Sequence, residues 1–259
     1  MRITKTLFIS AVLLMSATGL QAAGFIQKGN YLTVQLKEHQ NYGPSQIRLQ
    51  VVNDQIIRVQ ATAEQSFRNK QSLIIVPQNS KANYKVEEQG DKLIITTAAM
   101  RAVLNEATGQ ITFYDLKDNV LLNEVAQGGK TFKPFTVPDR EIGVDIAKVP
   151  EAQKHGWSWR ALFDSPDNEA FYGLGQHQSE ELNMKGKNED LFQYNTKVSV
   201  PFVISNKNYG ILWDSYSYCR WGNPDDYLQL NRAFKLYDKD GKEGQLTGTY
   251  VDKNGQKIV

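Results

Sequence analysis

The sequence predicts an all-β fold, an antiparallel β-sandwich with few and short helices. Apolar and polar residues alternate in many short segments, which is the period of a strand with one buried face. Turn-forming residues separate these segments at short and fairly regular intervals, as in sandwiches of antiparallel strands. After the N-terminal segment, no run of ten or more residues has a convincing helical period.

The expected strands share the alternation of apolar and polar side chains. They are Tyr31 to Leu36, Ile47 to Val52, Ile56 to Gln60, Leu93 to Thr97 and Gln110 to Tyr114. Turn residues lie between these segments, because Gly, Asn and Asp tolerate or stabilise the backbone that a turn needs. The expected turns are Asn53-Asp54, Gly90-Asp91, Ala107 to Gly109, Lys117 to Asn119 and Gln127 to Gly129.

A second block, from Trp157 to Tyr237, is rich in aromatic residues. Aromatic side chains on strands usually fill a hydrophobic core. In an exported protein they can also form a platform for sugars, because rings pack against the apolar face of a pyranose while polar groups bind its hydroxyls. The sequence leaves both interpretations open.

The first residues have the layout of a secretory signal peptide. Arg2 and Lys5 give a positive start, Leu7 to Met15 form an apolar run, and a small, polar ending extends from Ser16 to Ala23. The apolar run is about half of the ~20 residues that a membrane-spanning helix needs. We therefore expect residues 1–23 to be removed, and the mature protein to be secreted or periplasmic without binding a membrane.

Composition argues against several partners and sites. The chain has 30 Lys and Arg, 28 Asp and Glu and a formal net charge of +2, with both signs interspersed, so nucleic acid is not an expected partner. Cys219 is the only cysteine and is expected to be a buried or half-buried free thiol. His39, His155 and His177 have no short-spaced ligand beside them, so no metal site is expected. No nucleotide fingerprint is present, and no cofactor is expected.

Four elements follow one another between Phe171 and Asp214. They are Phe171 to His177 with a Tyr-Gly-Leu-Gly turn, a loop from Leu182 to Thr196, the Pro-Phe strand Val200 to Ser205, and the hairpin segment Tyr209 to Asp214. In this order they resemble the N-terminal β-sandwich of glycoside hydrolase family 31, a domain similar to galactose mutarotase. Gln176 to Gln178 and Gln193 to Thr196 resemble most the bacterial α-xylosidase and α-glucosidase branch.

The resemblance implies where the chemistry lies. These are retaining enzymes, which use two carboxyl groups as nucleophile and acid/base. In the family both are Asp residues of a (β/α)₈ barrel that follows the sandwich, and nothing in this chain matches the barrel's motifs. We therefore expect no catalytic residue here. We expect the chain to be the non-catalytic N-terminal module of an exported α-xylosidase or α-glucosidase that hydrolyses plant or dietary oligosaccharides. The oligosaccharide substrate would be bound through the catalytic barrel, which is missing from this chain.

One loop is expected to reach the substrate. The resemblance implies that the loop before the Pro-Phe strand places an Asn-x-Asp segment near the bound sugar. Asn188-Glu189-Asp190 is similar, although Glu189 stands where the family form has Arg. Asn195 is the rival candidate. Asp190 and Asn195 are thus the expected substrate-binding residues, and a plain polar turn at 188–190 is the alternative interpretation.

The expected domains follow from these boundaries. Residues 24–244 form the sandwich, and residues 245–259 begin a further β module. In that module Leu246 to Val251 predicts a strand and Asp252 to Gly255 a turn. Its opening resembles a PA14-type module inserted in this branch, which predicts a truncated chain. Without its barrel the sandwich should expose an apolar face, so self-association is expected.

The alternative function is a free-standing carbohydrate-binding or sugar-epimerising sandwich of the mutarotase type. Such an epimerase needs a His and a Glu as general acid and base. His177 and Glu180 are the candidates. Their position at the Gly-Leu-Gly turn favours the glycosidase domain instead.

Overall fold

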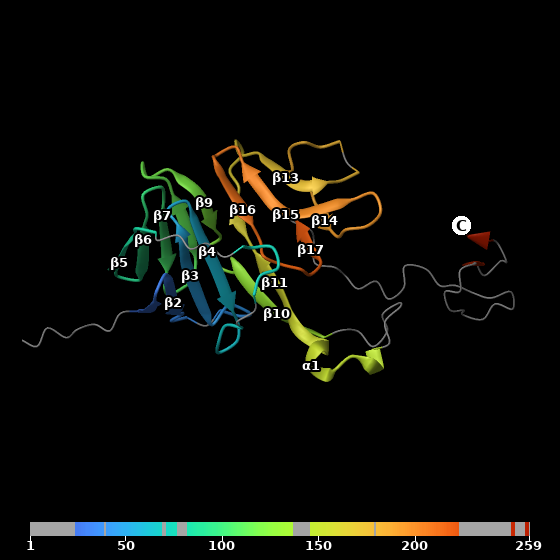
Figure 1. Ribbon diagram of the computed structural model, residues 1–259, viewed down its shortest axis with the longest axis horizontal. Coiled ribbons are helices and arrows are strands. Elements are labelled where there is room, and N and C mark those ends of the chain that lie inside the picture. Colours follow the sequence, from blue (N-terminus) through green and yellow to red (C-terminus); the bar gives the residue numbers. More distant parts are fainter. Residues whose placement is uncertain are drawn as a thin grey trace, which may run out of the picture. The chain divides into compact units, whose positions relative to one another are not determined.

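The computed structural model describes residues 24–38, 40–68, 71–76, 82–136, 146–178, 180–222, 250–251 and 257–258. The expected signal peptide, residues 1–23, lies outside the described residues. The described part is nearly all β-structure, which confirms the predicted fold class (Figure 1). Its helical content is a 3-10 turn at Ile146–Lys148 and the four-residue helix α1 at Glu151–Lys154.

The described residues fall into two compact units. Unit 1 consists of the described residues within Met1–Gly173 and Pro201–Tyr216. Unit 2 consists of those within Leu174–Val200 and Ser217–Val259. Strands β13 (Phe171–Gln176) and β15 (Val198–Ser205) each run from one unit into the other.

Two antiparallel sheets form the main part of unit 1. Four strands in consecutive order make the first: β1 (Phe25–Lys28), β2 (Tyr31–Gln35), β3 (Gln46–Asn53) and β4 (Ile56–Thr62). Six strands in the order β12-β9-β8-β7-β6-β5 make the second: β5 (Lys85–Gln89), β6 (Lys92–Thr96), β7 (Arg101–Asn105), β8 (Ile111–Tyr114), β9 (Val120–Glu124) and β12 (Phe163–Asp164). The expected strands correspond to β2, β3, β4, β6 and β8.

A single hydrophobic core joins these sheets. Alternate residues of β2 and β3 are fully buried, as Leu32 and Leu49 show, and so are alternate residues of β6 and β7, such as Leu93 and Leu104. They belong to one cluster, to which Ile111 of β8 also contributes. Because successive side chains of a strand point to opposite faces, each sheet turns one apolar face to the other. The expected sandwich is therefore confirmed.

Two longer strands, β10 (Lys130–Thr136) and β11 (His155–Ala161), pair antiparallel along their whole length. Figure 1 shows them as a two-stranded ribbon that leads to α1. The ribbon carries Trp157 and Trp159, which are 42% and 48% exposed. The core interpretation of the aromatic block is wrong for these two residues.

Strands β13, β15 and β16 (Tyr209–Leu212) form a three-stranded sheet. The Gly-Leu-Gly sequence lies inside β13, where Gly173, Leu174 and Gly175 have φ values of 133°, 69° and 97°. Leu174 is fully buried in spite of its left-handed backbone. The glycines therefore mark a local break inside a strand, and the next element described along the chain is another strand, Glu189–Leu191.

Strands β14 (Glu189–Leu191) and β17 (Cys219–Trp221) form a short antiparallel pair in unit 2. Cys219 is a half-buried free thiol, as expected. Farther along, β18 (Tyr250–Val251) pairs with β19 (Lys257–Ile258), which is the predicted hairpin. Residues 245–249 and the expected turn at Asp252 to Gly255 lie outside the described residues, and the start of a PA14-like module remains a prediction.

Candidate functional site

The Asn188 to Asp190 segment enters a strand and is not a plain turn. Strand β14 begins at Glu189, and its register pairs Asp190 with Arg220 of β17. Because side chains alternate along a strand, Glu189 points inward with 15% exposure of its side chain, while Asp190 is exposed. The alternation therefore presents the carboxylate of Asp190 to solvent.

Glu189 lies between two basic side chains of unit 2. Its Oε2 atom is 3.1 Å from Nδ1 of His177 and 3.1 Å from Nζ of Lys197. The His177 side chain is 5% exposed, and its Nε2 atom donates to the carbonyl oxygen of Leu174 at 2.8 Å. The largely buried carboxylate of Glu189 is tolerated because the Lys197 ammonium pairs with it. The residue that departs from the family form thus stabilises the base of the loop.

The same contacts bear on the alternative acid/base pair. His177 is buried against Glu189, whereas Glu180 is an exposed residue. A general acid or base must lie within hydrogen-bond reach of its substrate. The position of His177 in the interior of unit 2 is therefore that of a structural residue.

Exposed aromatic rings accompany Asp190. Tyr218 donates its hydroxyl to Oδ1 of Asp190 at 2.7 Å. The ring of Phe192 lies 6.5 Å from that of Tyr218 and 6.1 Å from that of Tyr194, between ring centroids. All three rings are at least half exposed. We call Phe192, Tyr194 and Tyr218 the aromatic patch; together with Asp190 it is the candidate site.

Asn195 lies at the edge of this site. It is exposed and forms a tight turn with Thr196, closed by a hydrogen bond from the Lys197 N–H to the Tyr194 carbonyl oxygen at 2.9 Å. The turn connects it to the aromatic patch through Tyr194. Asp190 and Asn195 are both accessible, and their role in binding a substrate remains a prediction.

Tyr218 was not singled out as a site residue by the sequence. It is 28 residues from Asp190 in the chain, and the β14–β17 pairing brings the two together. A usable signal was present, because Tyr216-Ser217-Tyr218 puts two aromatic residues with period two directly before a strand.

Other carboxylates are held in structural clusters of unit 1. Glu169, which is 2% exposed, accepts hydrogen bonds from the hydroxyls of Ser205 and Tyr209, each at 2.6 Å. Burial, together with the hydrogen bond to Glu169, raises the pKa of Tyr209 well above its usual range. Asp214 forms an ion pair with Arg58 at 2.7 Å. These contacts fix the β15–β16 hairpin and the segment that follows it.

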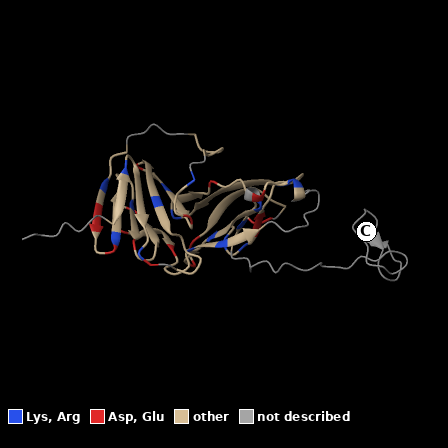
Figure 2. Cartoon of the chain, turned by 90° about the horizontal axis from the view of Figure 1, so that it is seen from below, with Lys and Arg blue, Asp and Glu red and all other residues tan. Residues whose placement is uncertain are grey.

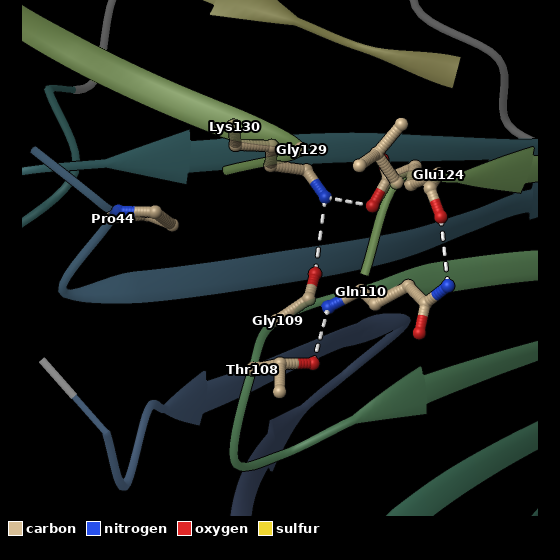
Figure 3. Close-up of a pocket in the computed structure, with 8 residues that line it drawn as sticks. Pro44, Thr108, Gly109, Gln110, Glu124, Gly129 and Lys130 are labelled. Atoms are coloured by element: carbon tan, nitrogen blue, oxygen red, sulfur yellow. Dashed lines mark hydrogen bonds and ion pairs between the residues drawn. The ribbon is translucent and has the colours of Figure 1, made fainter. Parts of the chain in front are cut away.

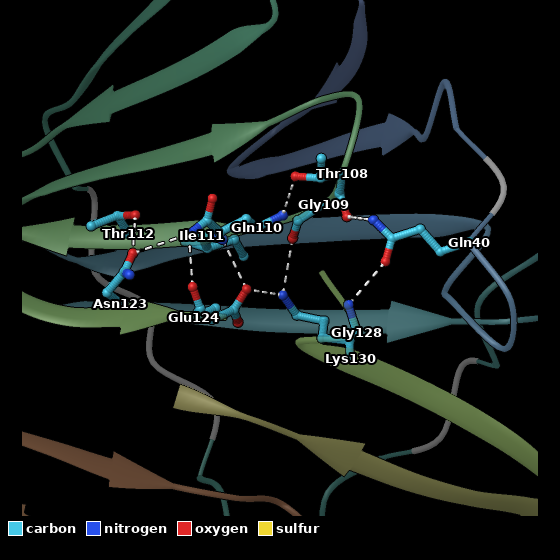
Figure 4. A network of polar contacts seen from close by, with 10 residues as sticks. All are labelled: Gln40, Thr108, Gly109, Gln110, Ile111, Thr112, Asn123, Glu124, Gly128 and Lys130. Atoms are coloured by element: carbon cyan, nitrogen blue, oxygen red, sulfur yellow. Dashed lines mark hydrogen bonds and ion pairs between the residues drawn. The ribbon is translucent and has the colours of Figure 1, made fainter. Parts of the chain in front are cut away.

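A small pocket in unit 1 surrounds a buried ion pair (Figure 3). Lys130 Nζ pairs with Glu124 Oε2 and donates to the Gly109 carbonyl oxygen at 3.1 Å. Glu124 Oε2 also accepts the Ile111 N–H at 2.8 Å, so the network joins the β7–β8 turn to β9 and β10 (Figure 4). The residues lining the pocket are Pro44, Thr108, Gly109, Gln110, Glu124, Val125, Gly129 and Lys130.

Burial shifts both ends of this ion pair towards their neutral forms. It raises the pKa of the Glu124 carboxyl and lowers the pKa of the Lys130 ammonium, and the attraction between the two charges opposes each shift. Since the polar groups at the pocket wall bond to one another, we assign the pair to the stability of the sandwich.

The surface carries both signs of charge. Figure 2 shows Lys and Arg interspersed with Asp and Glu over the described strands. Within the described ranges, no helix has the length and apolar character needed to cross a membrane. In the same residues, no group of three or more His, Cys, Asp and Glu side chains is arranged to hold a metal ion.

Comparison with known proteins identifies the family to which this chain is similar. Residues 46–221 match the model of the glycosyl hydrolase 31 N-terminal galactose mutarotase-like domain. The crystal structure of the family 31 α-xylosidase from Xanthomonas citri is 36% identical, with a TM-score of 0.66 over 90% of this chain and 23% of that chain. An α-xylosidase from a soil metagenome, solved with xylose, is 25% identical, with a TM-score of 0.57 over 76% of this chain and 28% of that chain.

A third relative, the α-xylosidase of Saccharolobus solfataricus, is 25% identical over 185 residues, which are 68% of this chain and 23% of the relative. The chain thus spans about a quarter of the length of each of these proteins. The family match contains the Gly-Leu-Gly strand, β14, β17 and the whole candidate site. The chain therefore belongs to the family of glycosyl hydrolase 31 N-terminal galactose mutarotase-like domains, the N-terminal domains of α-xylosidase-like enzymes.

Proposed function

We propose that the chain is the non-catalytic N-terminal module of an exported α-xylosidase or α-glucosidase that hydrolyses plant or dietary oligosaccharides. In this proposal residues 1–23 direct export to the periplasm or the medium. The sandwich supports a catalytic barrel, and the loop that contains β14 adds a wall to the substrate pocket. Membership of the family and the α-xylosidase names of its relatives support this assignment.

The contact between Asp190 and Tyr218 is the observation that carries the role of the loop. The Tyr218 hydroxyl donates to Oδ1 of Asp190, and a carboxylate exposed to solvent has the acceptor capacity to bind ligand hydroxyls as well. The rings of the aromatic patch offer flat apolar surface beside it. A sugar needs both kinds of contact, because its hydroxyls are polar and one face of its ring is apolar. We assign the polar contact to Asp190 first and to Asn195 second.

A chimaera tests this proposal. The Xanthomonas citri α-xylosidase would receive residues 46–221 of this chain in place of its own matching segment, and hydrolysis of 4-nitrophenyl α-xyloside and α-glucoside would be measured. We expect turnover by the chimaera and none by the 259-residue chain alone. In the chimaera, Asp190→Asn should raise KM by roughly tenfold, because the amide oxygen accepts weaker hydrogen bonds than the charged carboxylate does.

Glu180→Gln is the matched control, since it neutralises another exposed carboxylate of unit 2. It should leave KM and kcat unchanged. Turnover by the isolated chain would contradict its non-catalytic role. An unchanged KM in the Asp190→Asn chimaera would remove the loop from the substrate pocket while leaving the supporting role intact.

We also propose that the isolated chain self-associates through exposed apolar residues of unit 1. Leu73 and Val76 are 80% and 75% exposed, in a segment anchored by hydrogen bonds from the Ser72 hydroxyl to Asp214 at 2.8 Å and from the Leu73 N–H to the Tyr216 hydroxyl at 2.6 Å. Anchoring of the backbone holds these side chains in solvent, where contiguous apolar surface favours association.

Sedimentation velocity tests this self-association over a range of protein concentrations. We expect the sedimentation coefficient of the unaltered chain to rise with concentration, and the double variant Leu73→Ser with Val76→Ser to remain a monomer. Leu182→Ser is the control, because Leu182 is 77% exposed but belongs to unit 2. A monomeric unaltered chain at all concentrations would refute the proposal.

A further inference from the structure

Two tryptophans lie on one face of the β10–β11 ribbon. Trp157 and Trp159 are two residues apart in β11, so their side chains point to the same side, about 7 Å apart along the strand. The register places Pro134 opposite Trp157 and Phe132 opposite Trp159, which adds apolar surface to that side. Both indoles are nearly half exposed. The ribbon therefore presents a flat aromatic face.

Charged groups meet this face at Trp157. The indole Nε1–H of Trp157 donates to Oε1 of Glu64 at 3.3 Å. Arg68 donates to the same carboxylate, with Nε 3.1 Å from Oε2 and a second contact through its NH2 group. Glu64 thus fixes the orientation of the indole, and the hydrogen bonds from Arg68 and Trp157 hold the pKa of its carboxyl below the usual range. The face is preorganised and has a charged edge.

We propose that this face, made by Trp157 and Trp159 with Glu64 and Arg68 at its edge, binds an extended carbohydrate chain of pyranose units. Consecutive sugars stack on the two indoles, and their hydroxyls bond to the free acceptor sites of the Glu64 carboxylate and to the Arg68 guanidinium. Residue spacing in β11 orients the carbohydrate along the strand.

The charged edge favours a sugar over a protein partner. The buried centre of a protein interface is depleted of charged residues, because desolvating them is costly unless each finds a partner. Here the ion pair lies against Trp157 itself, so a protein that covered the indole would also cover Glu64 and Arg68. Sugar hydroxyls donate to the carboxylate and accept from the guanidinium, and they replace the water that is displaced.

This binding face is independent of the proposed role of Asp190. All its residues belong to unit 1, whereas the candidate site belongs to unit 2. It would hold a carbohydrate chain without any requirement for catalysis by the same molecule. Its failure and the failure of the proposed function can therefore be distinguished.

Affinity gel electrophoresis of the full chain tests this inference, with xyloglucan, dextran or mixed-linkage β-glucan dissolved in the gel. We expect at least one polysaccharide to slow the unaltered chain. The double variant Trp157→Ala with Trp159→Ala should bind about tenfold more weakly or worse, because both stacking surfaces are lost. Trp157→Phe with Trp159→Phe should retain most of the binding, since phenyl rings still stack.

Glu64→Gln keeps the acceptor for the Trp157 indole and removes the charge, and it should weaken binding several-fold. If circular dichroism shows that the double alanine variant does not fold, the binding of the Glu64→Gln variant tests the proposal instead. Phe135→Ala is the matched control, because Phe135 is an exposed aromatic residue on the opposite face of the same ribbon, and this variant should migrate as the unaltered chain does. The proposal is overturned if no polysaccharide slows the unaltered chain, if the alanine variant is slowed equally, or if the tryptophan substitutions change only the sedimentation coefficient, which would mark a protein contact.

Discussion

Replacing Lys130 by Met should destabilise the chain by about 3–5 kcal/mol, because it leaves the buried carboxylate of Glu124 without its cation. The side chains of Lys130 and Glu124 are only 10% and 4% exposed. Methionine fills a similar volume, so the expected loss comes from the unpaired charge and not from a cavity. Urea unfolding followed by circular dichroism measures this difference at neutral pH.

The direction in which the stability of the Lys130→Met variant changes with pH tests the role of the buried ion pair more specifically. Burial raises the pKa of Glu124 in the folded state, so the folded chain binds its proton more tightly than the unfolded chain does. In Lys130→Met the opposing attraction of the ammonium is gone, and the pKa should rise further. The variant should therefore recover stability as the pH falls from neutral towards the ordinary carboxyl range, and lose it as the pH rises.

Two further variants isolate the charge. Glu124→Gln combined with Lys130→Met removes both charges, keeps an acceptor for the Ile111 N–H, and should recover most of the loss without the pH dependence. Arg68→Met breaks an exposed ion pair in which the Arg68 side chain is 76% exposed, and it should leave the free energy of unfolding nearly unchanged. If Lys130→Met costs no more than Arg68→Met, the buried pair does not stabilise the sandwich.

Substituting Gly175 by Ala should destabilise unit 2 by about 3 kcal/mol, through backbone strain and a steric clash together. Gly175 has a φ of 97°, which side chains disfavour, and a Cβ atom there would overlap the Val198 carbonyl oxygen. Since Val198 begins β15, the clash would push β13 and β15 apart. Hydrogen exchange followed by mass spectrometry should show faster exchange in peptides from Leu174 to Val200.

Gly186→Ala is the matched control for this effect. Gly186 also lies in unit 2 with a positive φ of 70°, but a Cβ atom there meets nothing within 4 Å. Its cost should be about 1 kcal/mol, which is the penalty of the backbone conformation alone. Equal effects of the two substitutions would show that the close approach to Val198 contributes nothing.

The sandwich could be predicted because its strands are buried on one face. In β3, the buried residues Ile47, Leu49 and Val51 alternate with the half-buried polar residues Gln46, Arg48 and Gln50, and this period of two is visible in the sequence. The same reasoning failed for Trp157 and Trp159. A two-stranded ribbon has solvent near both faces, so an aromatic residue on it does not imply a core.

Contacts between residues that lie apart in the chain could not be predicted from the sequence. Nothing in the sequence indicates that Lys130 and Glu124 are buried, and only the packing of the β9–β10 segment against the β7–β8 turn shows it. The position of Asp190 was predicted as a candidate because the resemblance pointed to its loop. Its partner Tyr218 depends on the β14–β17 register, which a single sequence does not specify.

Side chains alternate between two faces along β14, so the number of residues in its loop matters more than which residues they are. Glu189 faces His177 and Lys197, and Asp190 faces solvent, because adjacent residues of a strand have opposite orientations. Substitution at an outward position leaves this arrangement in place. Deletion of one residue before β14 would move Asp190 into the inward position of Glu189, beside His177 and Lys197. We therefore expect this loop to tolerate substitutions at outward positions better than changes in its length.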